Sequence, residues 1–277
     1  MSAHRHILRR LIDYAAMDSA QSYERIQLEH GWTSHAGLTR AHNEDDVCVA
    51  VLASPREHVR HAPLLLAVAD GMGGEEAGEV ASRIAVERLC KETQRLYDTG
   101  NVPDEGRIPD IVASINDAVA DEAQRRGHAM GTTLVFALLH EGRAFLANIG
   151  DSRIYLWRNN APNLVRLVKD HSLVQDFVDR GYIDDVDRYT HPRRNLITRS
   201  LGDSNTGVSD DNPVLNLQQG DWLLLCSDGL WEMVRDDAIL TVLRRSSSTQ
   251  AACDELVALA NRNGGEDNIT VAAVRVH

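Results

Sequence analysis

The sequence has few cysteines, no long hydrophobic run and no surplus of positive charge. Its four cysteines, Cys48, Cys90, Cys226 and Cys253, form no C-x-x-C motif and have no histidine at the spacing of a zinc site, so we expect reduced, structural thiols. No stretch approaches the roughly 18 uncharged apolar residues of a membrane span. With 29 Lys and Arg against 41 Asp and Glu, the net charge is −12, which disfavours nucleic acid as a partner.

The composition is that of a folded globular chain. Of 277 residues, 43% are hydrophobic and 25% are charged, which is enough to bury one core without disulfides. We expect an N-terminal extension over residues 1–27 and a single domain over 28–277. The extension has a weak amphipathic pattern, typical of a docking helix or of a frayed tail, and it lacks the apolar core of a signal peptide. We therefore expect a cytoplasmic protein that does not insert into membranes.

Apolar runs alternate with amphipathic stretches in an order that predicts an α+β fold. Two predicted helices follow one another between groups of strands, which differs from the regular strand–helix alternation of a parallel sheet. The dipeptide Glu141-Gly142 lies between two apolar runs and predicts a tight hairpin. The predicted strands cover residues 46–52, 63–69, 132–139, 143–149, 153–157, 221–226 and 268–276, and the predicted helices cover 76–97, 108–126, 172–180, 237–245 and 249–261.

Acidic residues follow three of the predicted strands. Asp70, Asp151 and Asp228 each end an apolar run and each stand next to a glycine. A single Asp-Gly pair is more often a turn than a site, but three repetitions favour a shared role. Two further acidic clusters, around Glu44 and around Asp267, precede the strands at 46–52 and 268–276.

Carboxylates gathered at strand ends repel one another unless cations neutralise them. Oxygen ligands without a nearby His/Cys cluster favour Mg²⁺ or Mn²⁺ over Zn²⁺ or copper. Arg40, just before the Glu44 cluster, carries a planar fork that suits a phosphate dianion. The combination predicts metal-assisted phosphoryl chemistry.

Six short motifs together resemble the PP2C-type (PPM) protein serine/threonine phosphatases of bacteria. They occur in the family's order between about residue 33 and residue 276, and each would be a weak signal alone. The resemblance implies a central antiparallel β-sandwich flanked by helices on both sides, and the hydrolysis of phosphoserine and phosphothreonine by a water that bridges two metal ions. The motifs are Arg40 to Asp45, Ala67 to Gly74, Gly131 to Thr133, Asn148 to Arg153, Ser227 to Trp231 and Asp267 to Thr270.

The resemblance also implies a ligand set for two Mn²⁺ or Mg²⁺ ions. Asp70 would bridge both ions and would be catalytic in that role. Glu44 and the carbonyl of Gly71 would complete one site, and Asp228 and Asp267 would complete the other. Two ions placed in this way activate water for in-line attack on phosphorus, so no covalent intermediate is needed.

The remaining motif positions have supporting roles in the family. Arg40 matches the catalytic arginine that binds the phosphate, and Asp45 and Asn268 match residues around the ligands. Asp151, together with Asp228, matches the site of a third, weaker ion found in bacterial relatives.

One position departs from the animal members of the family. Met72 stands where they carry a histidine proposed as the general acid, so the source of the leaving-group proton stays open. His42, beside Arg40, is a candidate, although a surface histidine is the more economical interpretation.

A polar segment over about residues 170–204 matches the family's variable flap. Its cations could attract phosphopeptides, or they could form a solvated loop balanced by nearby acids, and the sequence favours neither interpretation. The cations are His191, Arg193, Arg194 and Arg199, and the acids are Asp184, Asp185 and Asp187.

Two alternative functions are disfavoured by the sequence. A nucleotide-binding site is disfavoured because the glycines at 71–74 do not complete a G-x-G-x-x-G motif and no Walker lysine follows. A binding module with a dead metal site is disfavoured because every metal-matching carboxylate is present. The family resemblance implies phosphorylated Ser/Thr proteins as substrates and a Hanks-type kinase as the opposing enzyme, and we expect a monomer.

Overall fold

The protein is a sandwich of two antiparallel β-sheets covered by helices on both outer faces. The computed structural model describes residues 27–53, 62–73, 77–101, 106–159, 161–203 and 213–277. The first sheet has the strand order β1-β11-β10-β7-β8, and the second has the order β2-β3-β5-β6-β9, with β4 paired to β3. The first sheet consists of β1 (Leu28–His35), β11 (Ile269–Val276), β10 (Trp222–Cys226), β7 (Arg153–Trp157) and β8 (Val165–Arg166). The second consists of β2 (Asp45–Val51), β3 (Leu64–Gly73), β5 (Leu134–His140), β6 (Arg143–Ile149) and β9 (Val214–Asn216), and β4 is Met130–Thr132.

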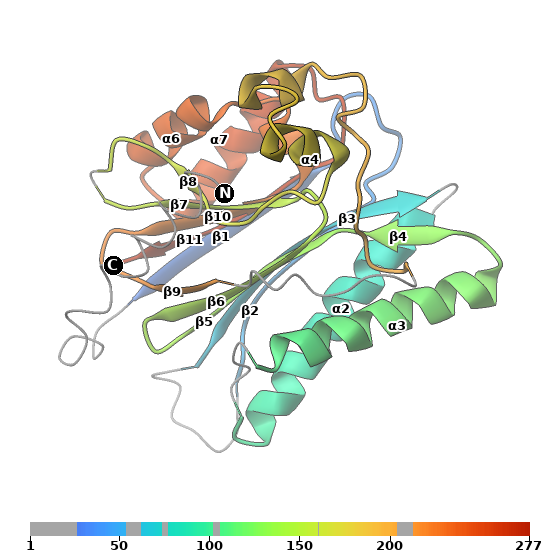
Figure 1. Ribbon diagram of the computed structural model, residues 1–277. Helices are drawn as coiled ribbons and strands as arrows, with labels where there is room; N and C mark the ends of the chain where they lie inside the picture. The colour runs from blue at the N-terminus through green and yellow to red at the C-terminus, as the bar shows by residue number, and fades with distance from the viewer. Residues whose placement is uncertain (1–26, 54–61, 74–76, 102–105, 160, 204–212) are drawn as a thin grey trace.

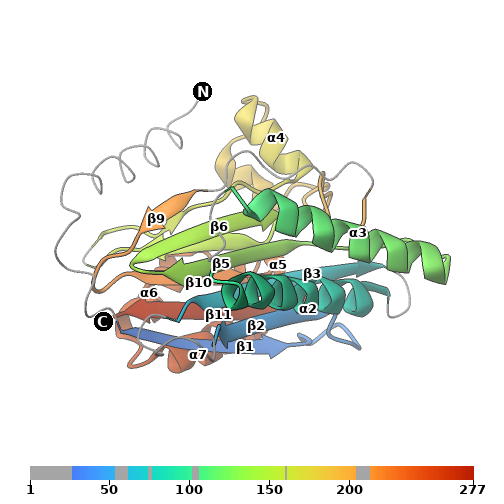
Figure 2. The same ribbon diagram turned by 90° about the horizontal axis from the view of Figure 1, so that it is seen from below.

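Helices cover each sheet on the side that faces away from the other sheet (Figure 1). The first sheet is covered by α6 (Asp236–Arg245) and α7 (Thr249–Arg262), and the second by α2 (Ala77–Asp98) and α3 (Ile108–Arg126). Figure 2 shows α2 and α3 side by side across the second sheet. The layers confirm the predicted helix-flanked antiparallel sandwich. Among the described residues, no helix is long and apolar enough to cross a membrane.

Three apolar layers hold the sandwich together. Leu66, Val68 and Leu225 belong to the layer between the sheets, which is closed to solvent. A second layer lies between α2, α3 and the second sheet, and a third lies between α6, α7 and the first sheet. Because both faces of the central strands are covered, β3 and β10 are apolar at consecutive positions rather than at alternate ones. Because the runs are continuous, both strands could be predicted from the sequence.

The hairpin predicted at Glu141-Gly142 joins β5 to β6. Glu141 has φ of 46° and Gly142 has φ of 73°, the two consecutive positive values that a type I′ turn requires. This turn type twists in the same sense as the strands that it connects. The prediction is confirmed, and the turn sets the register Leu138↔Phe145 in the ladder.

β1 was not predicted from the sequence, in which the first predicted strand covers residues 46–52. β1 pairs along its whole length with β11, from Leu28↔Val276 to His35↔Ile269. It is an edge strand and most of its residues keep some solvent exposure, so its sequence shows no strong apolar run. The strand follows directly after the predicted extension, whose residues 1–26 lie outside the described part.

Candidate metal centre

The second sheet brings acidic residues together at one end of the sandwich. Asp45 opens β2 and pairs directly with Asp70 of β3 in the antiparallel ladder. Glu44 lies one residue before β2, and its carbonyl accepts a hydrogen bond of 3.1 Å from the Gly71 backbone. The acids around residue 44 and Asp70 of β3 therefore meet across one strand pair.

The first sheet contributes acidic residues from the same end. Cys226, the last residue of β10, lies opposite Val271 of β11 and Arg153 of β7. Asp228 follows β10 at the start of the short helix α5 (Asp228–Trp231), and Asp267 stands just before β11. Asp151 lies in the connection from β6 to β7. Acids from both sheets therefore lie at one end of the sandwich: Glu44, Asp45, Asp70, Asp151, Asp228 and Asp267.

The charges of these acids oppose one another. Burial raises the pKa of Asp70 well above its usual value, and the charges of Asp228, Asp45, Asp151 and Asp267 raise it further. Burial, and then Asp151 and Asp267, raises the pKa of Asp228 in the same way. Burial is also the main cause that raises the pKa values of Asp45 and Asp151 to about 7. The cluster carries more negative charge than the protein compensates.

Several oxygens of the cluster have no hydrogen-bond partner. Oδ1 of Asp45, of Asp151 and of Asp228 are each closed to solvent and unpaired. Buried carboxylate oxygens are costly to leave unpaired, and divalent cations that prefer oxygen would satisfy them. Asp70 and Asp228 each keep part of their surface open, which gives an ion access. The donors therefore fit Mn²⁺ or Mg²⁺.

The carboxylate oxygens do not surround a common position in this arrangement of side chains. Within the described ranges, no group of three or more His, Cys, Asp or Glu side chains has the geometry of a formed ion site. One reason is visible at Asp267, whose Oδ2 is paired with Arg40 Nη2 at 2.7 Å. A second is visible at Asp45, whose Oδ2 accepts a hydrogen bond of 2.8 Å from Ser227. These two carboxylates are therefore each held by a protein partner.

Two glycines allow the backbone to approach Glu44 closely. A Cβ on Gly71 would lie 2.1 Å from the carbonyl oxygen of Gly78, and a Cβ on Gly78 would lie 2.8 Å from the Glu44 carboxylate carbon. Ser82 of α2 donates a hydrogen bond of 2.6 Å to the Glu44 carbonyl. The start of α2 therefore packs directly against the loop that presents Glu44, and any larger residue at 71 or 78 would separate them.

Asn268 organises the loop around residues 36–44. Its side-chain oxygen accepts a hydrogen bond of 2.8 Å from the Glu44 backbone, and its amide donates to the carbonyls of Ala36 and His42. Arg40 lies on the same loop with half of its side chain exposed. His42 is exposed. Met72 lies in β3, where its backbone is opposite Gly131.

A buried charged cluster that was not predicted from the sequence lies beside these acids. Asp170 accepts hydrogen bonds from three arginines: Arg153 at 2.7 Å, Arg188 at 3.0 Å and Arg166 at 3.1 Å. Arg153 also lies 3.6 Å above the ring centre of Trp231. The ring nitrogen of Trp231 donates in turn to the carbonyl of Asp151. The one available sequence signal was Arg153, which directly follows Asp151-Ser152.

The flap contains α4 (Leu173–Asp179), close to the helix predicted at 172–180, and the 3-10 helix η4 (Asp185–Tyr189). Arg188 of η4 is buried, so the segment is anchored to the body through Asp170. Arg194 is balanced by Glu232 at 3.4 Å and Glu266 at 3.8 Å. The acids that balance this flap cation therefore lie outside the flap and are not the predicted Asp184, Asp185 and Asp187.

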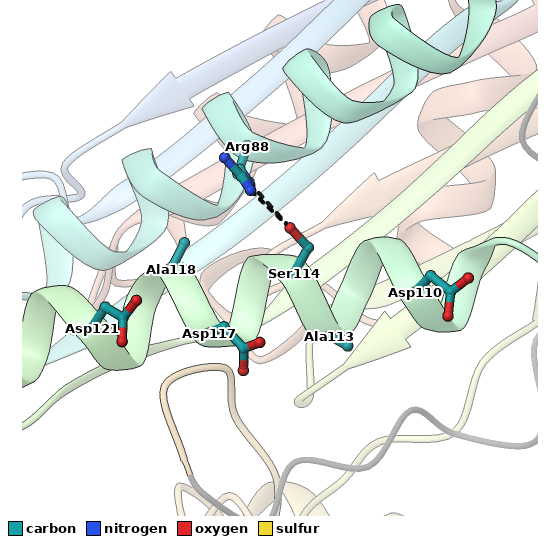
Figure 3. A pocket seen from close by; sticks show the side chains of 7 residues that line it. All are labelled: Arg88, Asp110, Ala113, Ser114, Asp117, Ala118 and Asp121. Carbon is teal, nitrogen blue, oxygen red and sulfur yellow. Dashed lines mark hydrogen bonds between the residues drawn. The ribbon is translucent and has the colours of Figure 1, made fainter.

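A pocket lies between α2 and α3, away from the acidic end of the sandwich. Figure 3 shows this space of about 510 Å³ between α2 and α3. Arg88 of α2 donates to the Ser114 hydroxyl across it, at 3.0 Å. The other lining residues are small or acidic, most of them are exposed, and none of them belongs to the candidate centre. The pocket therefore lacks the groups that would carry out the predicted chemistry. The lining residues are Arg88, Asp110, Ala113, Ser114, Asp117, Ala118 and Asp121.

Comparison with known proteins gives concordant matches. The family model described as "Protein phosphatase 2C" matches residues 42–262. The chain is 39% identical over 243 residues to the serine/threonine phosphatase stp of Listeria welshimeri, covering 86% of this chain and 92% of that one. It is 37% identical over 263 residues to the serine/threonine protein phosphatase PstP of Mycobacterium tuberculosis, covering 91% of this chain and 45% of that one.

Solved structures are similar over the same length. The serine/threonine phosphatase of S. agalactiae has a TM-score of 0.78 at 30% identity, covering 91% of this chain and all of that one (100%). The catalytic domain of PstP in complex with two manganese ions has a TM-score of 0.76 at 33% identity, covering 91% of this chain and 99% of that one.

Proposed function

The chain belongs to the protein phosphatase 2C family, and from that premise we propose that its acidic edge holds two divalent cations that serve the hydrolysis of phosphoserine and phosphothreonine. The enzyme is a metal-dependent serine/threonine phosphatase. The observation that supports this site is the gathering of mutually repelling carboxylates from both sheets at one end of the sandwich, with buried unpaired oxygens on Asp45, Asp151 and Asp228.

The ligand assignment follows the family resemblance. Asp70, at the centre of the repelling charges, would be the ligand shared by the two ions. Glu44 and the Gly71 carbonyl would hold one ion, and Asp228 and Asp267 would hold the other. When bound, the ions supply a water nucleophile at neutral pH and neutralise charge on the phosphoryl group.

The neighbouring residues hold this set and the substrate. Asp151, with Asp228, offers a place for a third ion. Asp45 and Asn268 orient the ligands, because Asp45 is fixed by Ser227 and Asn268 by the loop around Glu44. Arg40 binds the phosphate through its fork after exchanging its partner Asp267 for the substrate, which its half-exposed position permits.

The cellular setting follows the family expectation. We propose phosphorylated Ser/Thr proteins as substrates, a Hanks-type kinase as the opposing enzyme, and a monomer in the cytoplasm as the working form. Either Mn²⁺ or Mg²⁺ suits the oxygen donors. The relative crystallised with two manganese ions supports Mn²⁺ as the first metal to test.

The proposed function is tested by metal dependence. We expect the purified chain to hydrolyse p-nitrophenyl phosphate and a phosphothreonine peptide with Mn²⁺ or Mg²⁺, to stop in EDTA, and to recover when Mn²⁺ is restored. Ca²⁺ should support less turnover, because it holds its ligands at longer distances and in looser geometry. Folded protein that shows no turnover with any metal would contradict the proposal and favour a binding module.

A further inference from the structure

Two threonines hold the backbone of Asp70 where the ladder between β3 and β5 ends. The backbone N–H of Asp70 donates to Oγ1 of Thr133 at 3.0 Å, and the Asp70 carbonyl accepts from the Thr133 backbone N–H and from the Thr132 hydroxyl, each at 2.9 Å. The Thr133 hydroxyl also lies 2.7 Å from the Ser152 hydroxyl. Thr133 and Ser152 are both fully closed to solvent.

The Thr133–Ser152 hydrogen bond connects the two sheets. Thr133 precedes β5 of the second sheet, whereas Ser152 precedes β7 of the first sheet and directly follows Asp151. Gly150, with φ of +105°, packs so closely that a Cβ there would lie 2.5 Å from the Thr133 methyl group. Thr133 therefore links the backbone of Asp70 to the segment that carries Asp151.

A second hydroxyl makes an equivalent connection on the other side of the cluster. Ser227, directly before Asp228, donates to Oδ2 of Asp45 at 2.8 Å and accepts from the Thr270 backbone at 2.9 Å. Asp45 belongs to the second sheet and Ser227 to the first. Asp70, held by Thr133, and Asp228, next to Ser227, repel each other.

We propose that Thr133 and Ser227 are positioning residues, whose hydroxyls hold the carboxylates of the two sheets at the spacing that the divalent cations require. The inference rests on the proposed function. The Thr133 hydroxyl links the Asp70 backbone to Ser152, the residue after Asp151, and the Ser227 hydroxyl links the Asp45 carboxylate of the second sheet to the first sheet. Both links act against the repulsion between the acids. Removing one hydroxyl should let the edge of the sandwich open and should weaken cation binding.

Calorimetric titration with Mn²⁺ tests this role. Thr133→Val removes the hydroxyl and keeps the methyl group, whereas Thr133→Ser does the reverse. We expect Thr133→Val to weaken Mn²⁺ affinity roughly 10–100-fold, the usual effect of losing a group that orients ligands, and Thr133→Ser to keep affinity close to wild type. The matched control is Thr93→Val, at a fully buried threonine whose hydroxyl bonds only carbonyls of α2.

The half-saturating Mn²⁺ concentration for turnover should rise in Thr133→Val by the same factor, with kcat recovering at high Mn²⁺. Ser227→Ala provides a second, independent variant should Thr133→Val fail to fold. Variants that melt at lower temperature but bind Mn²⁺ like wild type would overturn the inference and leave the proposed function standing. A wild-type chain that binds no Mn²⁺ would overturn both.

A different observation carries a second inference. Cys48 of β2 and Cys90 of α2 place their Sγ atoms 2.6 Å apart, with the Cys90 thiol donating to Cys48. Both thiols are free and only partly buried, whereas Cys226 and Cys253 are buried. A disulfide bond is about 2.0 Å long, so a small movement of either side chain would join β2 to α2.

We infer that Cys48 and Cys90 form an oxidisable pair that a low-molecular-weight disulfide, such as oxidised glutathione, converts into an intrachain disulfide. The Cys48 thiolate attacks the external disulfide and releases one small thiol, and Cys90 then attacks the Cys48 sulfur of the mixed disulfide and releases the second. The two cysteine protons leave on the two small thiols, so two protein thiols are oxidised as one external disulfide is reduced.

Mass spectrometry of the full chain after treatment with oxidised glutathione tests the pair. We expect a mass lower by two hydrogen atoms and a cross-linked peptide containing residues 48 and 90. Cys48→Ser and Cys90→Ser should each abolish the cross-link, and the control Cys253→Ala should keep it. A glutathione adduct that persists on either cysteine, or two thiols that stay reduced, would overturn the inference.

Discussion

Asp70→Asn should abolish turnover while raising the melting temperature of the metal-free protein. Asp70 is the acid on which the charges of Asp228, Asp45, Asp151 and Asp267 converge, and burial adds to the cost of its own charge, as its raised pKa records. Asparagine has nearly the same shape but carries no charge. The substitution therefore removes both the bridging ligand and the centre of the repulsion.

The two effects have separate magnitudes. Ion-assisted charge stabilisation amounts to several kcal/mol, and each 1.36 kcal/mol is tenfold in rate, so we expect kcat/KM to fall by about a thousandfold or more. Relief of repulsion by a few kcal/mol would raise the melting temperature in EDTA by roughly 4–10 °C. Steady-state kinetics with Mn²⁺ and calorimetric melting in EDTA measure the two.

The control is Asp237→Asn, which makes the same chemical change at an exposed position in the first turn of α6. It should change neither quantity appreciably. An Asp70→Asn protein that keeps its activity would show that Asp70 is not an essential ligand, and one whose metal-free form melts well below wild type would show that Asp70 is not a source of repulsion.

The strands that carry Asp70 and Asp228 could be predicted because their environment is simple. Both strands are covered on both faces, so each is a continuous apolar run that stops abruptly at an Asp-Gly pair. β1 could not be found in this way, since it lies at a sheet edge and is specified by pairing with β11 over 200 residues away in sequence. Its place in the fold depends on its partner rather than on local pattern.

The candidate site likewise contains residues that could be predicted from local sequence and residues that could not. Acids placed at strand ends could be predicted, because strand direction and pairing bring strand ends together. The Asp170 cluster could not be, because its arginines come from β7, β8 and η4 and look like surface charges in sequence. Cys48 and Cys90 are 42 positions apart and were expected to be separate thiols; the structure shows them in contact, because α2 packs against β2.

Asp170→Asn should cause the largest loss of stability among single substitutions of buried polar groups in this cluster. Burial would raise the pKa of Asp170, but the charges of Arg153, Arg166 and Arg188 outweigh burial and hold that pKa at about 2. Without the carboxylate, three guanidinium groups would meet with no anion between them. Breaking a buried ion pair from one side costs about 3–5 kcal/mol, so we expect the melting temperature to fall by roughly 6–20 °C.

The pH dependence of this loss has a definite sign. Because the folded state lowers the pKa of Asp170, its charge stabilises the protein fully above the ordinary value of 3.8 and that stabilisation disappears as the pH falls through about 2. The gap between wild type and Asp170→Asn should therefore be constant from pH 7 to pH 5 and should shrink below pH 4. Urea unfolding across this range measures it.

Asp221→Asn supplies the matched control at another buried aspartate. Asp221 has one arginine partner, Arg158 at 3.0 Å, and there burial outweighs the partner and raises the pKa to about 6. The Asp221 charge therefore lowers stability at neutral pH, so Asp221→Asn should lose far less stability than Asp170→Asn. As the pH falls and Asp221 becomes protonated, the wild type gains stability, so the difference in stability between wild type and Asp221→Asn should grow. Equal losses in the two variants, or a gap for Asp170→Asn that persists unchanged to pH 2, would mean that the three arginines are held by packing and not by the Asp170 charge.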